Sequence, residues 1–420
     1  MRISFVSQPG HAVLPAAGSV ELWAEAVATR LADRHEVAIY ASRPPRDPPS
    51  SAGPIDYRLV SHGSAQLAIR LARYGWRLLP ATRPFYASSL HPLEYWRRVG
   101  RDISRQGADI VHVFNYSQAL PILRRLTNAK LVLHMHCEWL SQLDRGMVER
   151  RLRHADLIIG CSEYITDLVR ERFPHLASRC TTVYNGVVTS ARTTGTTEQR
   201  EVVHLLNVGR VSPEKGLHVL VDALEALLPQ HPLRVTILGE ESPVPREFAV
   251  KIATDPLVAD LDRFYGQSYL EHLRARMSPQ LAERVTFVDR VSHQEALGFY
   301  RDADIFVYPS IFESFAIPPV EAMAAGLPVV ASRVGGMQET IEDQRTGLLV
   351  EREDPAALAS ALHRLIDDPT LRRKFGDAGA RAAMRFSWEK VTASLESAYD
   401  SLLVAGAAAP RRPPDLLESA

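Results

Sequence analysis

The chain has 420 residues, of which 46% are apolar and 23% are charged, and its 49 acidic residues balance its 49 lysines and arginines. This composition is typical of a globular protein long enough for two domains, and the zero net charge argues against general binding to nucleic acid. No run of roughly eighteen apolar residues occurs, so the sequence predicts no membrane-spanning helix.

The cysteines and the N-terminus bear on the compartment. Cys137, Cys161 and Cys180 are too few and too irregularly spaced for a disulfide framework or a zinc site. The first residues, MRISFVSQPG, predict a strand and a turn instead of the basic and apolar segments of a signal peptide. We therefore expect a cytoplasmic protein.

Short apolar runs alternate with helical patterns along the whole chain. RISFVS, HEVAIYA, ADIVHVF, KLVLHMH and ADLIIGC come first, and HLLNVG, RVTILG, RVTFV, ADIFVYP and PVVAS follow after the polar, aperiodic residues 189–201. Continuous apolar strands separated by helices are typical of parallel sheets covered on both faces. The sequence therefore predicts an α/β protein with two doubly wound domains, residues 1–188 and 202–386, joined by a linker at 189–201. Ligands of such sheets bind outside the carboxyl ends of the strands, so we expect a cleft between the domains.

Two further segments belong to this outline. An amphipathic pattern predicts a last helix over residues 387–403, and residues 405–420, rich in Ala and Pro, are expected to be disordered. Residues 240–283 also have a helical pattern, which predicts an extra helix or a contact surface whose role the sequence leaves open.

Gly18 lies where the first helix is expected to begin, with Ser19 as its expected N-cap. A glycine at a helix N-terminus lets the backbone approach a phosphate group. The alternative is a glycine that only the turn requires.

Residues 70–105 are rich in arginine and in aromatic residues. Such a segment can bind an anionic acceptor or a membrane surface. The alternative, which we favour, is a set of solvated helix faces with aromatic side chains packed beneath the arginines.

His134 and His136 end a predicted strand, and their spacing places both imidazoles on one face. A metal pair would need a third ligand, and none stands nearby in the sequence. We therefore expect hydrogen-bonded histidines.

Arg210 and Lys215 lie in the turn of a strand-to-helix segment, VHLLNVGRVSPEKGLHVLVDALEALL. The guanidinium fork and the compact ammonium group together suit the oxygens of a phosphate. The alternative is a pair of solvated loop cations, as most Arg and Lys residues are.

Glu313 and Glu321 are separated by seven residues in FESFAIPPVEAMAAG. Pro319 suits the first turn of a helix, whose free N–H groups and dipole form an anion site. A diphosphate group fits such a site. The alternative is that the two acids and two prolines only cap and begin the helix, as they do in many helices. The nearby pair Asp302 and Asp304 is expected to cap and solvate a turn and not to bind a metal.

These segments resemble, in order along the chain, the motifs of the family-4 (group 1) retaining glycosyltransferases of the GT-B fold. VGRVSPEKG resembles the phosphate-binding signature, and FESFAIPPVEAMAAG resembles the Glu-seven-Glu motif. The segments YNGV, TILG, RDADIFVYPS and GGMQETIEDQRTGLLV extend the resemblance over most of the chain. In this family, a helix such as 387–403 crosses back to pack on the N-terminal domain.

The resemblance implies roles for the C-terminal half. Arg210 and Lys215 would neutralise the leaving diphosphate, and Glu321 would hold the ribose. The donor sugar and the nucleotide base would be bound by Glu313, by the backbone of Ser314, Phe315 and Ala316, and by the backbone at Arg290 and Val291. Two residues depart from the pattern, because Ala316 and Asp289 stand where the family usually has glycine.

For the N-terminal half, the resemblance implies that Gly18 approaches the donor phosphate and that His136 lies near the donor sugar. The family usually has a second glycine where Ser19 stands. The co-substrate would be a nucleotide diphosphate sugar, by default a UDP-sugar, with no other cofactor and no metal.

The predicted function is thus retaining transfer of a hexose or N-acetylhexosamine to a hydroxyl of a small-molecule, sugar or lipid-linked acceptor. A sugar-nucleotide epimerase of the same fold would need acid and base carboxylates that the N-terminal motifs do not show. A catalytically silent partner subunit would have lost the basic or acidic motif residues, which are present. A dehydrogenase is disfavoured because no G-x-G-x-x-G opens a strand-to-helix turn. The oligomeric state and any peripheral membrane contact are left open.

Overall fold

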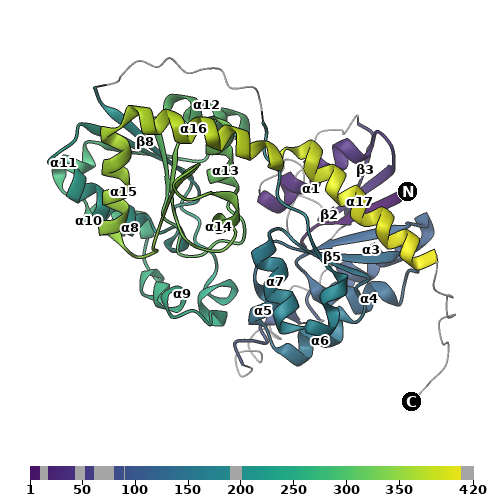
Figure 1. The fold of residues 1–420 in the computed structure, drawn as a ribbon. Coiled ribbons are helices and arrows are strands. Elements are labelled where there is room, and N and C mark those ends of the chain that lie inside the picture. Colours follow the sequence, from purple (N-terminus) through teal and green to yellow (C-terminus); the bar gives the residue numbers. More distant parts are fainter. Residues whose placement is uncertain (10–17, 43–52, 61–79, 89, 190–200, 408–420) are drawn as a thin grey trace.

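The computed structural model describes residues 1–9, 18–42, 53–60, 80–88, 90–189 and 201–407. They form two parallel sheets with helices on both faces, which confirms the predicted α/β class (Figure 1). In this described part of the chain, no helix is long and apolar enough to cross a membrane.

The N-terminal sheet has seven strands in the order β3-β2-β1-β4-β5-β6-β7. Its strands are β1 (Arg2–Val6), β2 (Glu36–Ser42), β3 (Ile55–Val60), β4 (Ile110–Phe114), β5 (Lys130–Met135), β6 (Leu157–Gly160) and β7 (Cys180–Thr182). The accompanying helices are α1 (Ser19–Leu31), α3 (Leu93–Gln106), α4 (Leu120–Arg124), α5 (Trp139–Gln142), α6 (Arg145–Leu152) and α7 (Glu163–Arg172).

The C-terminal sheet has six strands in the order β10-β9-β8-β11-β12-β13. Its strands are β8 (Val203–Val208), β9 (Leu233–Leu238), β10 (Val285–Val288), β11 (Ile305–Tyr308), β12 (Val329–Ser332) and β13 (Gly347–Val350). The accompanying helices are α8 (Leu217–Leu227), α9 (Pro256–Asp260), α10 (Tyr269–Arg276), α11 (Pro279–Ala282), α12 (His293–Asp302), α13 (Ile317–Ala324), α14 (Met337–Thr340), α15 (Pro355–Asp367) and α16 (Pro369–Ala383).

The order of strands in each sheet reverses beside its first strand. β1 lies between β2 and β4, and β8 lies between β9 and β11. Loops that leave neighbouring strands on opposite sides open a crevice at their carboxyl ends, where ligands of doubly wound sheets bind. The segments after β8 and β11 contain the residues that the sequence predicts to bind the phosphates and the donor sugar.

The last helix, α17 (Trp388–Ala407), leaves the C-terminal half and lies across α1 (Figure 1). Its Leu395 and Tyr399 are buried in a core that also contains Trp23 of α1. Glu396 accepts a hydrogen bond from Nε2 of His35 at 2.8 Å. Residues 405–407 continue this helix, so the predicted disorder does not begin at 405; residues 408–420 lie outside the described ones.

Several expectations for single segments can be compared with the structure. Ser19 is not an N-cap, because α1 begins at Ser19 and Gly18 occupies the cap position. Asp304 does act locally, since its Oδ2 accepts a hydrogen bond from the backbone N–H of His204 at 2.8 Å. Most of the predicted linker, residues 190–200, and the arginine-rich residues 70–79 lie outside the described part.

The two halves are tied together around the C-terminal end of β6. The hydroxyl of Ser162 donates to the carbonyl of Ser314 at 2.6 Å, and Glu339 accepts from the backbone N–H groups of Glu163 and Tyr164 at 2.9 Å each. A carboxylate at a helix N-terminus satisfies otherwise free N–H groups, so Glu339 caps α7 from the other half of the molecule.

Candidate active site

The loops after β8 and β11 touch each other because Gly216 has no side chain. Gly216 has φ +63°, and a Cβ atom there would stand 2.0 Å from the carbonyl oxygen of Pro309. Only glycine adopts this conformation and allows this approach at low cost. The close contact brings the turn containing Lys215 onto the loop that leads to Glu313.

Lys215 and Glu313 form an ion pair in this contact. The hydroxyl of Ser310 donates to the same Oε1 atom of Glu313 at 3.0 Å, and the ammonium group lies 5.4 Å from the ring centre of Tyr308. Burial alone would lower the pKa of Lys215, but the charge of Glu313 outweighs it and raises this pKa above its usual value. Lys215 therefore stays cationic, as its predicted role in phosphate binding requires.

Arg210 lies at the start of the same turn and is more open to solvent. Its Nη2 pairs with Oε1 of the buried Glu214 at 2.8 Å, and its Nη1 donates to the carbonyl of Ser242 at 3.3 Å. With 43% of its side chain exposed, the guanidinium retains free donor capacity on its outer side. The two predicted phosphate cations thus share one loop.

The loop before α13 offers backbone donors. Within the described residues, the N–H groups of Ser314, Phe315 and Ala316 donate to no other protein group. Ala316 occupies the N-cap position of α13 with φ +67°, a region that favours glycine. The N-terminus of α13 and these amides therefore leave N–H donors beside Glu313, the arrangement that the predicted anion site requires.

The loop before α13 is held in place by contacts with Gly335 and Gly336 and by the packing of Phe315. A Cβ atom on Gly335 would stand 1.7 Å from the carbonyl oxygen of Glu313, and one on Gly336 would stand 2.5 Å from that of Ser314. The ring of Phe315 is buried against Tyr184 and Phe386, with ring centres 6.0 and 5.4 Å away. Neighbouring segments therefore fix the backbone of the loop.

Glu321 lies in the second turn of α13 and is 7% exposed. Its Oε1 accepts from Nε2 of His293 at 2.5 Å, and its Oε2 accepts from the hydroxyl of Tyr300 at 2.9 Å. The hydrogen bond to Glu321 raises the pKa of His293. The carboxylate is thus oriented by two partners, with acceptor capacity remaining on both oxygens.

Arg290 and Val291 follow β10 at the surface. The backbone N–H of Arg290 donates to Oδ1 of Asp289 at 2.7 Å, and Arg290 Nη1 lies 3.5 Å from Oε1 of Glu240. Asp289, which stands where the resembling family has glycine, therefore already occupies one of the backbone donors predicted to meet a nucleotide base.

His136 follows β5, at the carboxyl edge of the N-terminal sheet. Its ring centre lies 4.2 Å from that of His134, so the two imidazoles share a face as predicted. Burial lowers the pKa of His136 to about 3, an effect that the side chain of Asn185 partly offsets. His136 is thus a neutral imidazole. No described contact brings it or Gly18 to Lys215 or Glu313.

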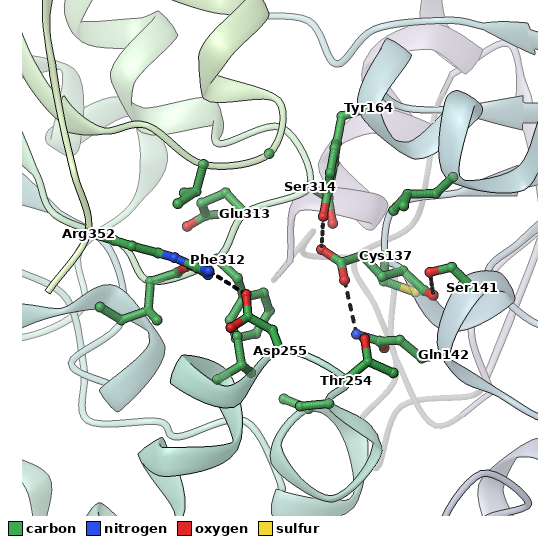
Figure 2. Close-up of a pocket in the computed structure, with 18 of the residues that line it drawn as sticks. Cys137, Ser141, Gln142, Tyr164, Thr254, Asp255, Phe312, Glu313, Ser314 and Arg352 are labelled. Carbon is green, nitrogen blue, oxygen red and sulfur yellow. Dashed lines mark hydrogen bonds and ion pairs between the residues drawn. The ribbon is translucent and has the colours of Figure 1, made fainter. Parts of the chain in front are cut away.

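A cavity of about 920 Å³ lies between the two halves (Figure 2). Of the predicted residues, only Glu313 and Ser314 line it. Side chains that the sequence reasoning did not single out make up most of the wall, among them Glu138, Trp139, Tyr164, Phe248, Asp255 and Arg352.

Glu138 is the most informative of these additional residues. Its Oε1 accepts from the hydroxyl of Tyr164 at 2.8 Å and its Oε2 from Nε2 of Gln142 at 3.0 Å. Burial raises the pKa of this carboxyl, and the charge of Asp255 across the cavity adds to the effect. Its place two residues beyond His136, at the carboxyl end of β5, is a signal that could have found it.

Two family models match the chain over adjacent ranges. The model described as "Glycosyl transferases group 1" matches residues 194–382, and the one described as "Glycosyltransferase Family 4" matches residues 20–191.

The chain is also similar to individual proteins, both in sequence and in structure. The spore coat protein SA of Bacillus subtilis (strain 168) is 26% identical over 91% of this chain and 94% of its own length. The D-inositol 3-phosphate glycosyltransferase of Corynebacterium efficiens is 35% identical over 47% of this chain, and this match spans 42% of that relative's length. Among solved structures, Anabaena HepE in complex with UDP-glucose superposes with a TM-score of 0.67 at 19% identity, over 96% of this chain and all of the other.

Proposed function

Because the chain belongs to the family-4 (group 1) glycosyltransferases and has their GT-B fold, we propose that it moves a sugar from a UDP-sugar to an acceptor hydroxyl with retention of configuration. The sugar is a hexose or an N-acetylhexosamine. Residues 202–386 bind the donor, and residues 1–188, with the helix over 387–403, contribute the acceptor side.

The observation that carries this proposal is the pair of Lys215 and Glu313 beside the free amides of Ser314 to Ala316. A cation and a carboxylate at one spot are what a nucleotide diphosphate sugar needs. The diphosphate requires positive charge and N–H donors, while the sugar hydroxyls require an acceptor.

In the reaction, the bond between the anomeric carbon and the diphosphate oxygen breaks, and negative charge develops on the diphosphate. Lys215, Arg210 and the N-terminus of α13 stabilise that charge, which is where fixed positive groups lower a barrier most. The acceptor oxygen attacks the same face of the anomeric carbon, and its proton passes to an oxygen of the departing diphosphate. These groups supply the charge compensation, so the step as proposed uses no metal ion.

The remaining residues position the donor. Glu313 accepts hydrogen bonds from the sugar hydroxyls, and Glu321, oriented by His293 and Tyr300, accepts from the ribose hydroxyls. The carbonyl of Arg290 and the backbone of Val291 meet the base, because Asp289 already accepts from the N–H of Arg290. On the other side, Gly18 lets α1 approach the phosphates, and His136, held neutral by burial, hydrogen-bonds the sugar.

UDP is proposed as the nucleotide because a protein of the same fold, Anabaena HepE, binds UDP-glucose. The test is the thermal stabilisation of the protein by UDP, GDP, ADP and TDP without added metal. A ligand at one hundred times its dissociation constant stabilises by about 2.7 kcal/mol, so the preferred nucleotide gives a clear rise in melting temperature. We expect the largest rise with UDP, and a larger rise with another nucleotide would overturn the choice of donor.

A second step tests the chemistry. UDP-glucose, UDP-galactose and their N-acetylamino forms are incubated with and without a panel of hydroxylated acceptors, and the anomeric configuration of the product is read by NMR. Retention in an acceptor-dependent product is the expected result. An acceptor-independent change in the donor sugar would favour an epimerase, and binding without any turnover would favour a silent partner subunit.

A further inference from the structure

The segment between β9 and α10 reaches across the cavity to the N-terminal half. It contains three short 3-10 helices, η5 (Arg246–Phe248), η6 (Val250–Ile252) and η7 (Leu261–Phe264), together with α9. Figure 1 shows α9 on the side of the C-terminal half that faces α5 and α7. We call residues 244–260 the strap.

The strap is docked on the N-terminal half through Phe248. The hydroxyl of Tyr86 donates to the carbonyl of Glu247 at 3.0 Å, and Nε1 of Trp139 donates to the carbonyl of Phe248 at 3.2 Å. The ring of Phe248 meets that of Tyr86 edge to face, with centres 4.3 Å apart, and that of Trp139 at 5.7 Å. Two directed hydrogen bonds and an aromatic cluster make this a specific contact and not a chance approach of two surfaces.

The strap is equally fixed on the C-terminal half. Arg352 pairs with Asp255 at 2.5 Å and donates to the carbonyl of Ile311 at 3.0 Å, next to the loop that carries Glu313. The hydroxyl of Tyr265 donates to the carbonyl of Val244 at 2.7 Å. The strap therefore bridges the two halves and closes one side of the cavity.

The cavity wall that results is rich in hydrogen-bond acceptors for hydroxyl groups. Figure 2 shows Thr254 and Asp255 of the strap among the lining residues, together with Ser141 and Gln142 from the N-terminal half. Glu138 adds a half-buried carboxylate with acceptor capacity beyond its two partners.

Two of the three described arginines that line this wall are paired with carboxylates, and the third donates to a backbone carbonyl. Among the described lining residues, Arg352 pairs with Asp255, Arg333 pairs with Asp343 at 2.7 Å, and Arg172 donates to the carbonyl of Leu143 at 2.5 Å. A phosphate on the acceptor would compete with Asp255 and Asp343 for two of these arginines and would face the carboxylate of Glu138.

We propose that the strap forms the wall of the acceptor site and that the contact of Phe248 with the N-terminal half holds the strap in place. The strap then selects a compact, hydroxyl-rich acceptor without phosphate groups. This inference rests on the proposed transferase function. A wall closed by the Phe248 contact also keeps water from the donor sugar, which favours transfer over hydrolysis.

The first arm of the test compares Phe248→Ala with Phe248→Tyr and with Leu257→Ala. Leu257 belongs to the strap but is 37% exposed and does not line the cavity, which makes it the matched control. We expect Phe248→Ala to raise the acceptor KM at least fivefold and to increase hydrolysis of the UDP-sugar in the absence of acceptor, with UDP affinity within twofold of wild type. Phe248→Tyr and Leu257→Ala should behave like wild type. An unchanged acceptor KM and unchanged hydrolysis in Phe248→Ala would overturn the proposal.

The second arm uses acceptors in matched pairs, such as glucose with glucose 6-phosphate and inositol with inositol phosphate. Higher kcat/KM for the free form of each pair is expected, and a preference for the phosphorylated form would overturn the acceptor class.

The third arm separates this inference from the proposed function. If wild type neither binds UDP nor turns over any UDP-sugar, the proposed function has failed. In that case, amide hydrogen exchange over residues 244–252 still measures how firmly the strap is held against the N-terminal half. Trp139→Ala should speed this exchange at least tenfold if the contact seats the strap, and unchanged exchange would show that it does not.

Discussion

Nζ of Lys215 and Oε1 of Glu313 meet in an ion pair although 98 positions separate them in the chain. Each side chain keeps only 12% of its exposure, so each charge depends on the other for compensation. The adjacency of β8 and β11 in the sheet produces this pair, since both residues follow the carboxyl ends of these neighbouring strands.

Because of this ion pair, Lys215→Ala should lower both the activity and the stability of the protein. Activity should fall at least a thousandfold, because the leaving diphosphate loses its buried cation. The free energy of unfolding should also fall, by about 1–3 kcal/mol, because Glu313 is left buried without its partner. Adding Glu313→Gln to Lys215→Ala should restore most of the stability and none of the activity. Urea unfolding and initial rates measure both effects, and normal turnover in Lys215→Ala would refute the assignment.

The contact between His293 and Glu321 predicts a pH dependence of nucleotide affinity. The hydrogen bond to Glu321 raises the pKa of His293, so the stabilising pair is complete below pH 6.5 and is lost as pH rises through the raised pKa. Protonated His293 draws the negative charge of the Glu321 carboxylate more strongly than neutral His293 does, which leaves a weaker acceptor for the ribose hydroxyls. UDP should therefore bind severalfold more tightly as pH rises through this window. In His293→Gln this dependence should disappear, and calorimetry at pH 6, 7 and 8 measures it. An equal pH dependence in both proteins would contradict this effect of His293 on Glu321.

The sequence predicts the fold well where strands are apolar and continuous. It misses β3, whose residues are half exposed at a sheet edge, the three-residue β7, and the short edge strand β13, whose segment stands out only for its resemblance to a family motif. Buried runs carry a clear signal because both faces are covered, whereas edge and very short strands do not.

The residues of the candidate site also differ in how well the sequence predicts them. Residues that follow strand ends, such as Lys215 and Glu313, can be found from the sequence because sheet topology brings those ends together. The meeting of Phe248 with Trp139 cannot, since it depends on how the long segment between β9 and α10 folds against the other half. No periodicity or spacing encodes such a contact.

Replacing Ala316 by glycine should relieve backbone strain in the loop before α13. At φ +67° an L-residue is strained by about 1–2 kcal/mol, and this gain is partly offset by the extra freedom of glycine in the unfolded chain. We expect Ala316→Gly to be neutral or to stabilise by up to about 1 kcal/mol, with activity retained. The same change at Ala380, inside α16, should cost about 1 kcal/mol. Equal losses at the two positions in thermal unfolding would show that the strain is absent.

Gly335 should not tolerate a methyl group. The added Cβ would collide with the carbonyl oxygen of Glu313, so Gly335→Ala must displace the loop that presents this carboxylate. A loss of about 1–3 kcal/mol in stability and a large loss of activity are expected. Gly298→Ala is the control, because Gly298 lies in α12 with open space around it and should gain about 0.5–1 kcal/mol. A fully active Gly335→Ala would mean that the loop position does not matter for turnover.

Three buried histidines should make the protein sensitive to mild acid. Burial lowers the pKa of His136 to about 3 and holds those of His112 and His134 well below their ordinary value, whereas in the unfolded chain all three return to about 6.5. As pH falls below 6.5, the unfolded state binds more protons, so stability is present above that pH and is lost below it. Each histidine contributes up to about 1.4 kcal/mol per pH unit. Urea unfolding between pH 7.5 and 5.5 should show this slope, and the slope should be smaller in His134→Gln. It should be unchanged in His175→Gln, whose side chain is 53% exposed. A slope equal in all three proteins would place the acid sensitivity elsewhere than in this buried cluster.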